Sequence, residues 1–350
     1  MSSVLRVSVA AVLAAVSFSS NAQWAGLNNY VQIGNYALPT LSPSPPTAAS
    51  SKEFEASAVT WNPDTNTLFM LGDGGGFIMQ TTLTGTPIDF MKLPTGSSPQ
   101  GNEFYDPEGL TYIGGGKFVM TEERYRTAVQ FTYAAGTSLQ RAQTSTVKLG
   151  TTVGNVGLEG VTYDPVTGGF IFINETSGPT GSSQNIFQTQ IDFASGTATN
   201  GSAGTLNNTS LFPVGNIGYT SLNDVYALAN QYNSSSTGYQ NLLVLSHGGI
   251  KEMTRTGVVA GSLTLPGTGY ESEGITMDNN GLIYVVTDNG NAGTQSALLV
   301  YSAAPVPEPE GYGLALAGLG TLGLVIRRKK SRASASGTRI SVALKSLHSR

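Results

Sequence analysis

The sequence contains no cysteine and only two histidines, and 11% of its 350 residues are charged. The absence of cysteine excludes disulfide bonds, thiolate metal sites and cysteine nucleophiles. The histidines are His247 and His348, and a Ser-His-Asp triad is not expected at Ser246-His247, because neighbours on an extended chain point to opposite faces. The sequence also has no Gly-x-Ser-x-Gly elbow, no P-loop and no His-Glu-x-x-His pattern. The residues therefore indicate none of these common catalytic machineries.

Positive charge is scarce in the middle of the chain. Residues 306–350 hold eight basic and two acidic residues, whereas residues 23–305 hold nine basic and twenty acidic residues, a net charge of −11. A protein that binds nucleic acid through basic patches is excluded by this balance. The 44 glycines, with 9% aromatic residues, favour short strands and turns over long helices.

The N-terminus has the pattern of a secretory signal. Residues 1–22 contain an early Arg6, an apolar run over residues 7–18 and the small or polar residues Ser20-Asn21-Ala22. This order predicts a signal peptide over residues 1–22 that is cleaved before Gln23. The mature chain is therefore expected to leave the cytoplasm.

The C-terminus has a second sorting pattern. Residues 305–330 contain Pro307-Glu308-Pro309, an apolar segment over 311–326 and a basic cluster over 327–330. Sixteen apolar residues would span about 24 Å as a helix, and the following basic residues predict a cytoplasmic C-terminal side. We therefore expect a transmembrane segment that transiently anchors the acidic domain at the inner membrane. A basic, serine-rich tail follows over residues 331–350.

This tripartite segment resembles the PEP-CTERM sorting signal of Gram-negative bacteria that make exopolysaccharide. The resemblance implies recognition and cleavage by an exosortase-type processing enzyme. It also implies a final location in the periplasm, at the outer surface or in the extracellular matrix, with exopolysaccharide or a surface ligand as a partner. The tail over residues 331–350 departs from the pattern, because such signals usually end soon after the basic cluster.

The middle of the chain is a repeat. Five similar segments begin a strand, and four of them are followed by a turn and a second apolar run. The segments are Ser57-Ala58-Val59-Thr60-Trp61, Glu108-Gly109-Leu110-Thr111-Tyr112, Glu159-Gly160-Val161-Thr162-Tyr163, Asn223-Asp224-Val225-Tyr226-Ala227 and Glu273-Gly274-Ile275-Thr276-Met277. A unit of about fifty residues that opens with a β-hairpin leaves room for two further strands, as in a propeller blade.

The repeat predicts an all-β fold over residues 23–304, a five-bladed β-propeller with four-stranded antiparallel blades. The last copy is short, so we expect the N-terminal strand Tyr30–Ile33 to complete its blade. Six blades remain an alternative, because the longer interval between the third and fourth copies has room for extra strands. An open solenoid is a second alternative, but it would need capping repeats.

Acidic residues recur at one end of the predicted hairpins. Pairing Thr111 with Phe118, and Leu110 with Val119, returns the chain beside Glu108 at residues 121–123. The same construction sets Glu159 near Glu175, and Glu273 near Asp288. The candidate metal ligands are Glu108, Glu159, Glu273, Glu123, Glu175 and Asp288. In the first copy the construction sets Asp73 near Ser57, and in the fourth copy it sets Asn223 and Asp224 near His247.

The first strand of a propeller blade is innermost, so these acids should meet at one mouth of the central channel. Carboxylates within about 4 to 6 Å of one another raise one another's pKa values unless a cation lies between them. Oxygen ligands without thiolates favour Ca²⁺ over Mg²⁺. The alternative is that these acids cap turns by accepting backbone hydrogen bonds.

The segments Asp106-Pro107-Glu108-Gly109-Leu110-Thr111-Tyr112 and Gly157-Leu158-Glu159-Gly160-Val161-Thr162-Tyr163 resemble the SdiA-regulated (YjiK-like) β-propeller family. The resemblance covers roughly residues 53–303, with Glu273-Gly274-Ile275 as a further match. It implies five blades, an extracytoplasmic or membrane-attached protein and bound calcium held by Glu108, Glu159 and Glu273, and it implies no established catalysis. Ser57 and Asn223 depart from the carboxylate at that position.

Two functions follow as hypotheses. The first is an exported, calcium-binding, non-catalytic binding or scaffold module at the cell surface or in exopolysaccharide. The second is a metal-dependent hydrolase, because the motif around Glu159 also resembles phytase-like esterase propellers and, more distantly, lactonases. A hydrolase of this kind would use its metal to polarise an ester and activate water.

Overall fold

The computed structural model describes residues 23–41, 48–72, 76–96, 103–177, 181–266, 271–288 and 295–304. The predicted signal peptide, the sorting segment with residues 311–326, the tail and Asp73 lie outside these residues. Within the described ranges, no helix is both long and apolar enough to span a membrane.

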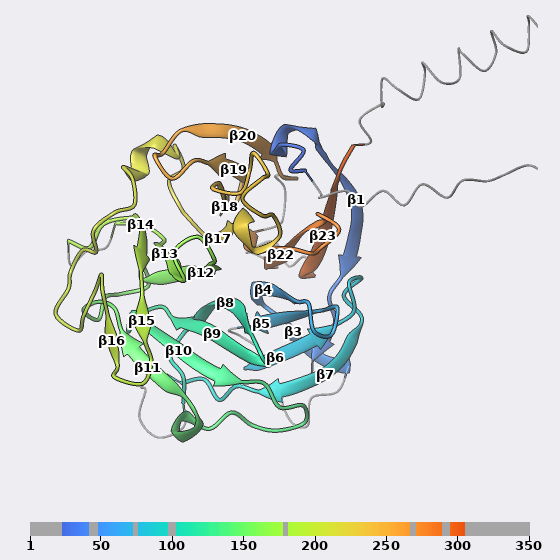
Figure 1. Cartoon of the computed structure of the whole chain (residues 1–350). Helices are drawn as coiled ribbons and strands as arrows, with labels where there is room; N and C mark the ends of the chain where they lie inside the picture. Colours follow the sequence, from blue (N-terminus) through green and yellow to red (C-terminus); the bar gives the residue numbers. More distant parts are fainter. Residues whose placement is uncertain are drawn as a thin grey trace, which may run out of the picture. The chain divides into compact units, whose positions relative to one another are not determined.

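Antiparallel sheets follow one another around a common centre (Figure 1). Blade 1 contains β4 (Ala56–Asn62), β5 (Thr67–Gly72), β6 (Phe77–Thr81) and β7 (Pro87–Lys92). Blade 2 contains β8 (Pro107–Gly114), β9 (Lys117–Glu122), β10 (Thr127–Thr132) and β11 (Ser145–Lys148). Blade 4 contains β17 (Asp224–Ala227), β18 (Leu242–Ser246), β19 (Gly249–Met253) and β20 (Val259–Thr264). Blade 5 contains β21 (Glu271–Met277), β22 (Ile283–Asp288), β23 (Ala297–Ala303) and β1 (Tyr30–Ala37).

Blade 3 differs from the four-stranded pattern. Its sheet contains β12 (Leu158–Asp164), β13 (Gly169–Asn174) and β14 (Asn185–Thr189), and a separate hairpin follows, β15 (Ile191–Asp192) with β16 (Thr197–Ala198). The long interval before the fourth copy therefore holds this hairpin and no sixth blade. The remaining elements are β2 (Thr40–Leu41) paired with β3 (Ala48–Glu53), and the 3-10 turns η1 (Leu27–Asn29), η2 (Arg141–Gln143), η3 (Val214–Asn216) and η4 (Leu228–Asn230).

The ring closes through both ends of the domain, which confirms the five-bladed prediction. The first strands contact one another in a complete circle, β4 to β8, β12, β17, β21 and back to β4. The predicted N-terminal strand pairs with β23 from Tyr30 opposite Ala303 to Ala37 opposite Ala297. This circle rules out an open solenoid, and the last blade is completed by the start of the domain.

The hydrophobic core is divided into five clusters, one at each junction between neighbouring blades. Blades 1 and 2, for example, share a cluster in which the Phe69 and Phe118 rings lie 4.8 Å apart. The first strand β4 is buried along its whole length, whereas β1 exposes most of its residues. Because a blade is covered on both faces, its inner strands are continuous runs of apolar and small residues.

The first hairpin of blade 2 has a register one residue away from the predicted one. Thr111 pairs with Val119, and Tyr112 pairs with Phe118, because irregularities fall between Tyr112 and Gly114 and between Pro107 and Leu110. The second irregularity restores the expected alignment, so Pro107 lies opposite Glu122. The prediction that residues 121–123 lie beside Glu108 is therefore confirmed, although the register predicted for Leu110 and Thr111 is wrong by one residue.

A threonine hydroxyl links the first strands at four of the five junctions. In each case the threonine Oγ1 atom accepts a backbone N–H group of the next blade at 3.0 to 3.2 Å. The four pairs are Thr60 with Tyr112, Thr111 with Tyr163, Thr162 with Ala227, and Thr276 with Trp61. At the remaining junction the Tyr226 hydroxyl donates to the Met277 carbonyl, 3.4 Å away. The repeated threonine of the motif is therefore a buried link between blades.

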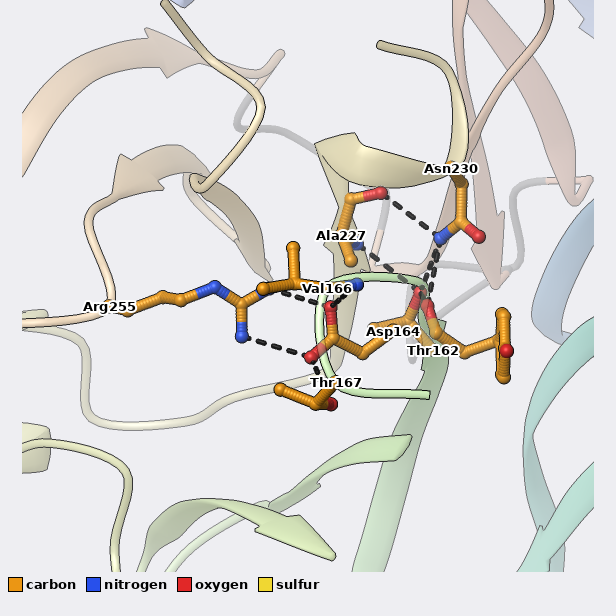
Figure 2. Close-up of polar contacts among 8 residues, drawn as sticks. Thr162, Asp164, Val166, Thr167, Ala227, Asn230 and Arg255 are labelled. Carbon is orange, nitrogen blue, oxygen red and sulfur yellow. Dashed lines mark hydrogen bonds and ion pairs between the residues drawn. The ribbon is translucent and has the colours of Figure 1, made fainter. Parts of the chain in front are cut away.

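The junction between blades 3 and 4 has a second link (Figure 2). The Arg255 guanidinium donates to both carboxylate oxygens of the fully buried Asp164, at 3.0 and 2.6 Å. Thr167 and the Val166 N–H donate to the same carboxylate. The buried Asp164 carboxylate is thus paired and hydrogen-bonded through both oxygens, which fixes the position of the turn that follows β12.

We predict that Thr111→Val destabilises the protein by about 1 to 3 kcal/mol, because the Tyr163 N–H loses its acceptor in a partly buried position. Valine keeps the shape of threonine, so the packing changes little. Urea unfolding measures the difference, with Thr84→Val as a matched control, since Thr84 is exposed and its hydroxyl contacts only Thr82. Equal losses of stability in both variants would contradict the linking role of Thr111.

Candidate metal centre

The six predicted ligands line one cavity at the mouth where the first strands begin. Glu108, Glu159 and Glu273 lie at the start of β8, β12 and β21, and Glu123, Glu175 and Asp288 lie at or just after the end of the second strands. The cavity has a volume of about 260 Å³. Its lining also includes Ser57, Asn155, Asn223, His247 and Glu271. The hairpin geometry thus gathers acids from three blades, and the two departures, Ser57 and Asn223, occupy the same rim.

Two overlapping triads of carboxylates lie at this mouth, and all of their members except Asp106 line the cavity. One is Asp106, Glu108 and Glu123, the other is Glu123, Glu159 and Glu175, and in each triad one oxygen per residue lies within 4.8 Å of the others. Glu123 belongs to both triads. Glu273 and Asp288 line the cavity but belong to neither triad.

Glu123 is held in place by its surroundings. Its side chain is 1% exposed and accepts the Gly157 N–H at 3.0 Å. Arg124 lies 3.7 Å from its second oxygen and is paired with Asp106. Burial, with a hydrogen bond to Asp106, raises the pKa of Glu123 to about 8. A protonated or cation-bound Glu123 is therefore favoured at neutral pH.

The same electrostatic cost applies to Glu159 and Glu273. Burial raises the pKa of Glu159 well above its usual value, and Glu108, Glu123, Glu175 and Glu273 raise it further. Burial also raises the pKa of Glu273 to about 8, although Asn223 donates a hydrogen bond to it at 2.7 Å. Like charges crowded into a buried space favour either protons or a metal ion.

Asp224, on the fourth repeat, is buried and does not line this cavity. Its carboxylate accepts the N–H groups of Ile275 and Val225, each at 2.8 Å, and that of Val161. Burial raises the pKa of Asp224 well above its usual value despite these bonds. The side chain joins three neighbouring blades through backbone donors and is not part of the cavity lining.

Asp106 and Glu271 were missed by the sequence interpretation. Each precedes the motif glutamate by two residues, Asp106 before Glu108 and Glu271 before Glu273. Asp106 has a positive φ of 53° and lies in the first triad, and Glu271 lines the cavity opposite Asp288. A search for a second acid two residues before each motif would have found both.

The donor set fits a hard divalent cation. The atoms of each triad are carboxylate oxygens, which are the ligands that Ca²⁺ prefers. Two oxygens bound to one Ca²⁺ at about 2.4 Å lie at most about 4.8 Å apart, so each triad is compact enough for one ion. Bound Ca²⁺ would neutralise the charge that raises the pKa values of these acids.

The fold is that of a β-propeller, and the comparison of the chain with known families gives a more specific result. Residues 47–290 match the SdiA-regulated family, and residues 305–329 match the PEP-CTERM protein-sorting motif. The chain therefore belongs to the SdiA-regulated family. The sorting motif indicates export and surface sorting in Gram-negative bacteria and implies processing by an exosortase-type enzyme.

Solved structures with a related arrangement are only distantly similar. XC5397 from Xanthomonas campestris, described as a gluconolactonase, has 9% identity and a TM-score of 0.44 over 78% of this chain and 99% of its own. A glucose dehydrogenase has 14% identity and a TM-score of 0.40 over 79% and 99%. Virginiamycin B lyase from Staphylococcus aureus has 12% identity and a TM-score of 0.33 over 79% and 75%. These similarities are too low to indicate an activity.

We predict that the metal-free protein loses stability as the pH rises from about 5 to about 8. Glu123 and Glu273 have pKa values of about 8 in the folded state, whereas the ordinary value of a glutamate is 4.5. Between these two pH values the folded protein binds more protons than the unfolded chain. The free energy of unfolding is therefore highest below pH 4.5 and decreases as the pH rises to about 8. Urea unfolding in the presence of EDTA at several pH values measures the slope. Glu123→Gln should flatten it, and a stability that increases with pH across this window would contradict the prediction.

Proposed function

We propose that this protein is an exported, non-catalytic binding or scaffold module whose acidic cavity binds Ca²⁺. The observation that carries the proposal is the pair of carboxylate triads that share Glu123. Acids from blades 2 and 3 meet there at the cost of strongly raised pKa values, which a structural turn cap would not require. Glu273, Asp288 and Glu271 line the remaining wall and would supply further or water-mediated ligands.

The domain organisation of the proposal follows the sequence. Residues 1–22 form a signal peptide, residues 23–304 the propeller, residues 305–330 the sorting segment and residues 331–350 a basic tail. The segment 311–326 anchors the chain transiently in the inner membrane until an exosortase-type enzyme cleaves it. The released propeller then acts in the periplasm, at the outer surface or in the extracellular matrix, with exopolysaccharide or another surface ligand as its partner.

We expect Ca²⁺ to raise the melting temperature of the exported protein after EDTA treatment. An ion that binds only the folded state stabilises it by about 2.7 kcal/mol at a concentration a hundred times its Kd. Differential scanning calorimetry with Ca²⁺ and with Mg²⁺ measures the effect, which should be larger for Ca²⁺. The substitution Glu159→Gln should remove most of the stabilisation.

Glu103→Gln is the matched control, because Glu103 is exposed and does not line the cavity. This variant should respond to Ca²⁺ like the unmodified protein. A melting temperature that neither EDTA nor Ca²⁺ changes would contradict the calcium proposal.

A metal-dependent hydrolase of phosphate or lactone esters is the second candidate function. The observation that favours it is His247, which lines the same cavity with its Nδ1 atom 3.8 Å from a Glu273 oxygen and 3.4 Å from the Asn223 amide nitrogen. Histidine is the side chain that most often serves as a general acid or base in catalysis. Its side chain is 42% exposed, so a substrate in the cavity could reach it.

Under the leading proposal, we expect no turnover of generic phosphoesters or lactones in the presence of Ca²⁺, Mn²⁺ or Zn²⁺. Colorimetric assays of the exported protein measure this directly. Turnover that disappears in His247→Ala and Glu159→Gln, while both variants stay folded by circular dichroism, would establish the hydrolase instead.

A further inference from the structure

A second cavity lies at the opposite mouth of the central channel. The first strands carry the acids where they begin and the residues of this cavity where they end, for example Glu108 and Tyr112 on β8. Four residues of extended chain separate the two mouths by about 13 Å. The cavity has a volume of about 240 Å³, less than the roughly 300 to 1,000 Å³ of sites for drug-sized ligands. It is suited to one small ring.

Aromatic side chains from four blades line this cavity. Trp61, Tyr112 and Tyr163 occupy the last position of the repeated segment, and Tyr226 comes from the fourth repeat. The repeat therefore produces a rim of aromatic residues at one end of the channel, as it produces a rim of acids at the other.

The polar edges of these rings are bonded to the protein. Trp61 Nε1 donates to Asn66 at 3.3 Å, and the Tyr112 hydroxyl donates to Asp64 and accepts the Gly116 N–H. These bonds fix the orientation of the two rings. The remaining contact that these two rings can offer a ligand is apolar.

Acceptor oxygens lie between the aromatic residues. The amide nitrogen of Asn230 donates hydrogen bonds to the Thr162 hydroxyl and to the carbonyl oxygens of Tyr163 and Ala227. Figure 2 shows its amide oxygen turned away from these contacts. Gln231 likewise donates from its amide nitrogen to Tyr226 and Met277. Within the described part of the chain, no donor bonds to either amide oxygen. A ligand with several hydroxyl donors would satisfy both.

We propose that this cavity binds one ring of a neutral carbohydrate. A sugar ring presents C–H groups that pack against aromatic side chains and O–H groups that donate to amide and carboxylate oxygens. A quaternary ammonium ion would also pack among aromatic rings, but it has no donor for the oxygens of Asn230 and Gln231. Asp64 is the single charged residue of the lining, and its negative charge disfavours an anionic sugar.

The proposal rests on the proposed function as a binding module with a carbohydrate partner, but it is independent of the calcium site. The two cavities share no lining residue, so a sugar at one mouth does not touch an ion at the other. Sugar binding should therefore persist in EDTA wherever circular dichroism shows that the fold is retained. A failure of calcium binding would appear in the melting experiment, and a failure of sugar binding would not.

Tryptophan fluorescence tests the proposal, because the chain has two tryptophans and Trp61 lines the cavity. The other, Trp24, is 5% exposed and is removed by Trp24→Phe to isolate the signal. The exported protein is titrated with glucose, galactose, mannose and cellobiose, with glucuronate and choline as comparison ligands. We expect a saturable change with at least one neutral sugar and a weaker or absent change with glucuronate and choline. Isothermal titration of the unmodified protein provides a second measurement.

Substitutions of Tyr163 separate the ring from its hydroxyl. Tyr163→Ala should weaken binding roughly three- to tenfold, whereas Tyr163→Phe keeps the ring and should bind more tightly than the alanine variant. Tyr239→Ala is the matched control, because Tyr239 is partly buried and lies outside the cavity lining. No saturable response to any neutral sugar, a stronger response to choline, or unchanged affinity in Tyr163→Ala would overturn the proposal.

Discussion

The close approach of the five first strands around the central channel is the constraint on which the rest of the structure depends. A Cβ atom on Gly109 would lie 2.4 Å from the Glu159 carbonyl oxygen, and one on Gly274 would lie 2.6 Å from the Val59 nitrogen. Neither approach is possible for a larger residue without moving a neighbouring strand. The glycine of the repeated segment therefore sets the width of the channel. The threonine two residues later then reaches the N–H of the next blade, since the backbones are already close enough for one hydroxyl to join them.

The fourth repeat breaks this pattern and replaces it with a different set of bonds. Asp224 stands where three other copies have glycine, and its carboxylate fills the space against Gly160. An added side chain is tolerated there because it accepts N–H groups from neighbouring strands. Tyr226 stands at the threonine position and reaches the next blade through its longer side chain. The degenerate copy thus joins its neighbours through a carboxylate and a tyrosine hydroxyl, where most other copies use a glycine for close approach and a threonine hydroxyl.

The five blades, the closing N-terminal strand and the meeting of all six candidate acids at one mouth could be predicted, because a repeat fixes which ends of the strands meet. The details that could not be predicted depend on individual side chains. Arg124 and Arg126 follow two glutamates in the sequence, but they do not both neutralise them. Glu122 is paired with Arg141, and Arg124 lies 3.7 Å from Glu123. Arg126 is fully buried and donates to the carbonyl groups of residues 205 and 206 and to Asn208. These partners lie in the long interval that has no equivalent in the other repeats, so no periodic pattern indicates them.

The direction of the first strands explains why one repeat can produce two different binding rims. All five run the same way along the channel, so the first position of every segment faces one mouth, and the last position of the first three segments faces the other. Carboxylates gathered at one mouth raise one another's pKa values and favour a cation, whereas aromatic rings gathered at the other exclude water and favour an uncharged ring. The residues of either rim can be substituted without affecting the other rim, because the contacts that close the ring are made by the glycine and threonine positions between the two rims. A propeller of this kind can therefore keep a stabilising ion at one mouth while the ligand bound at the other mouth differs.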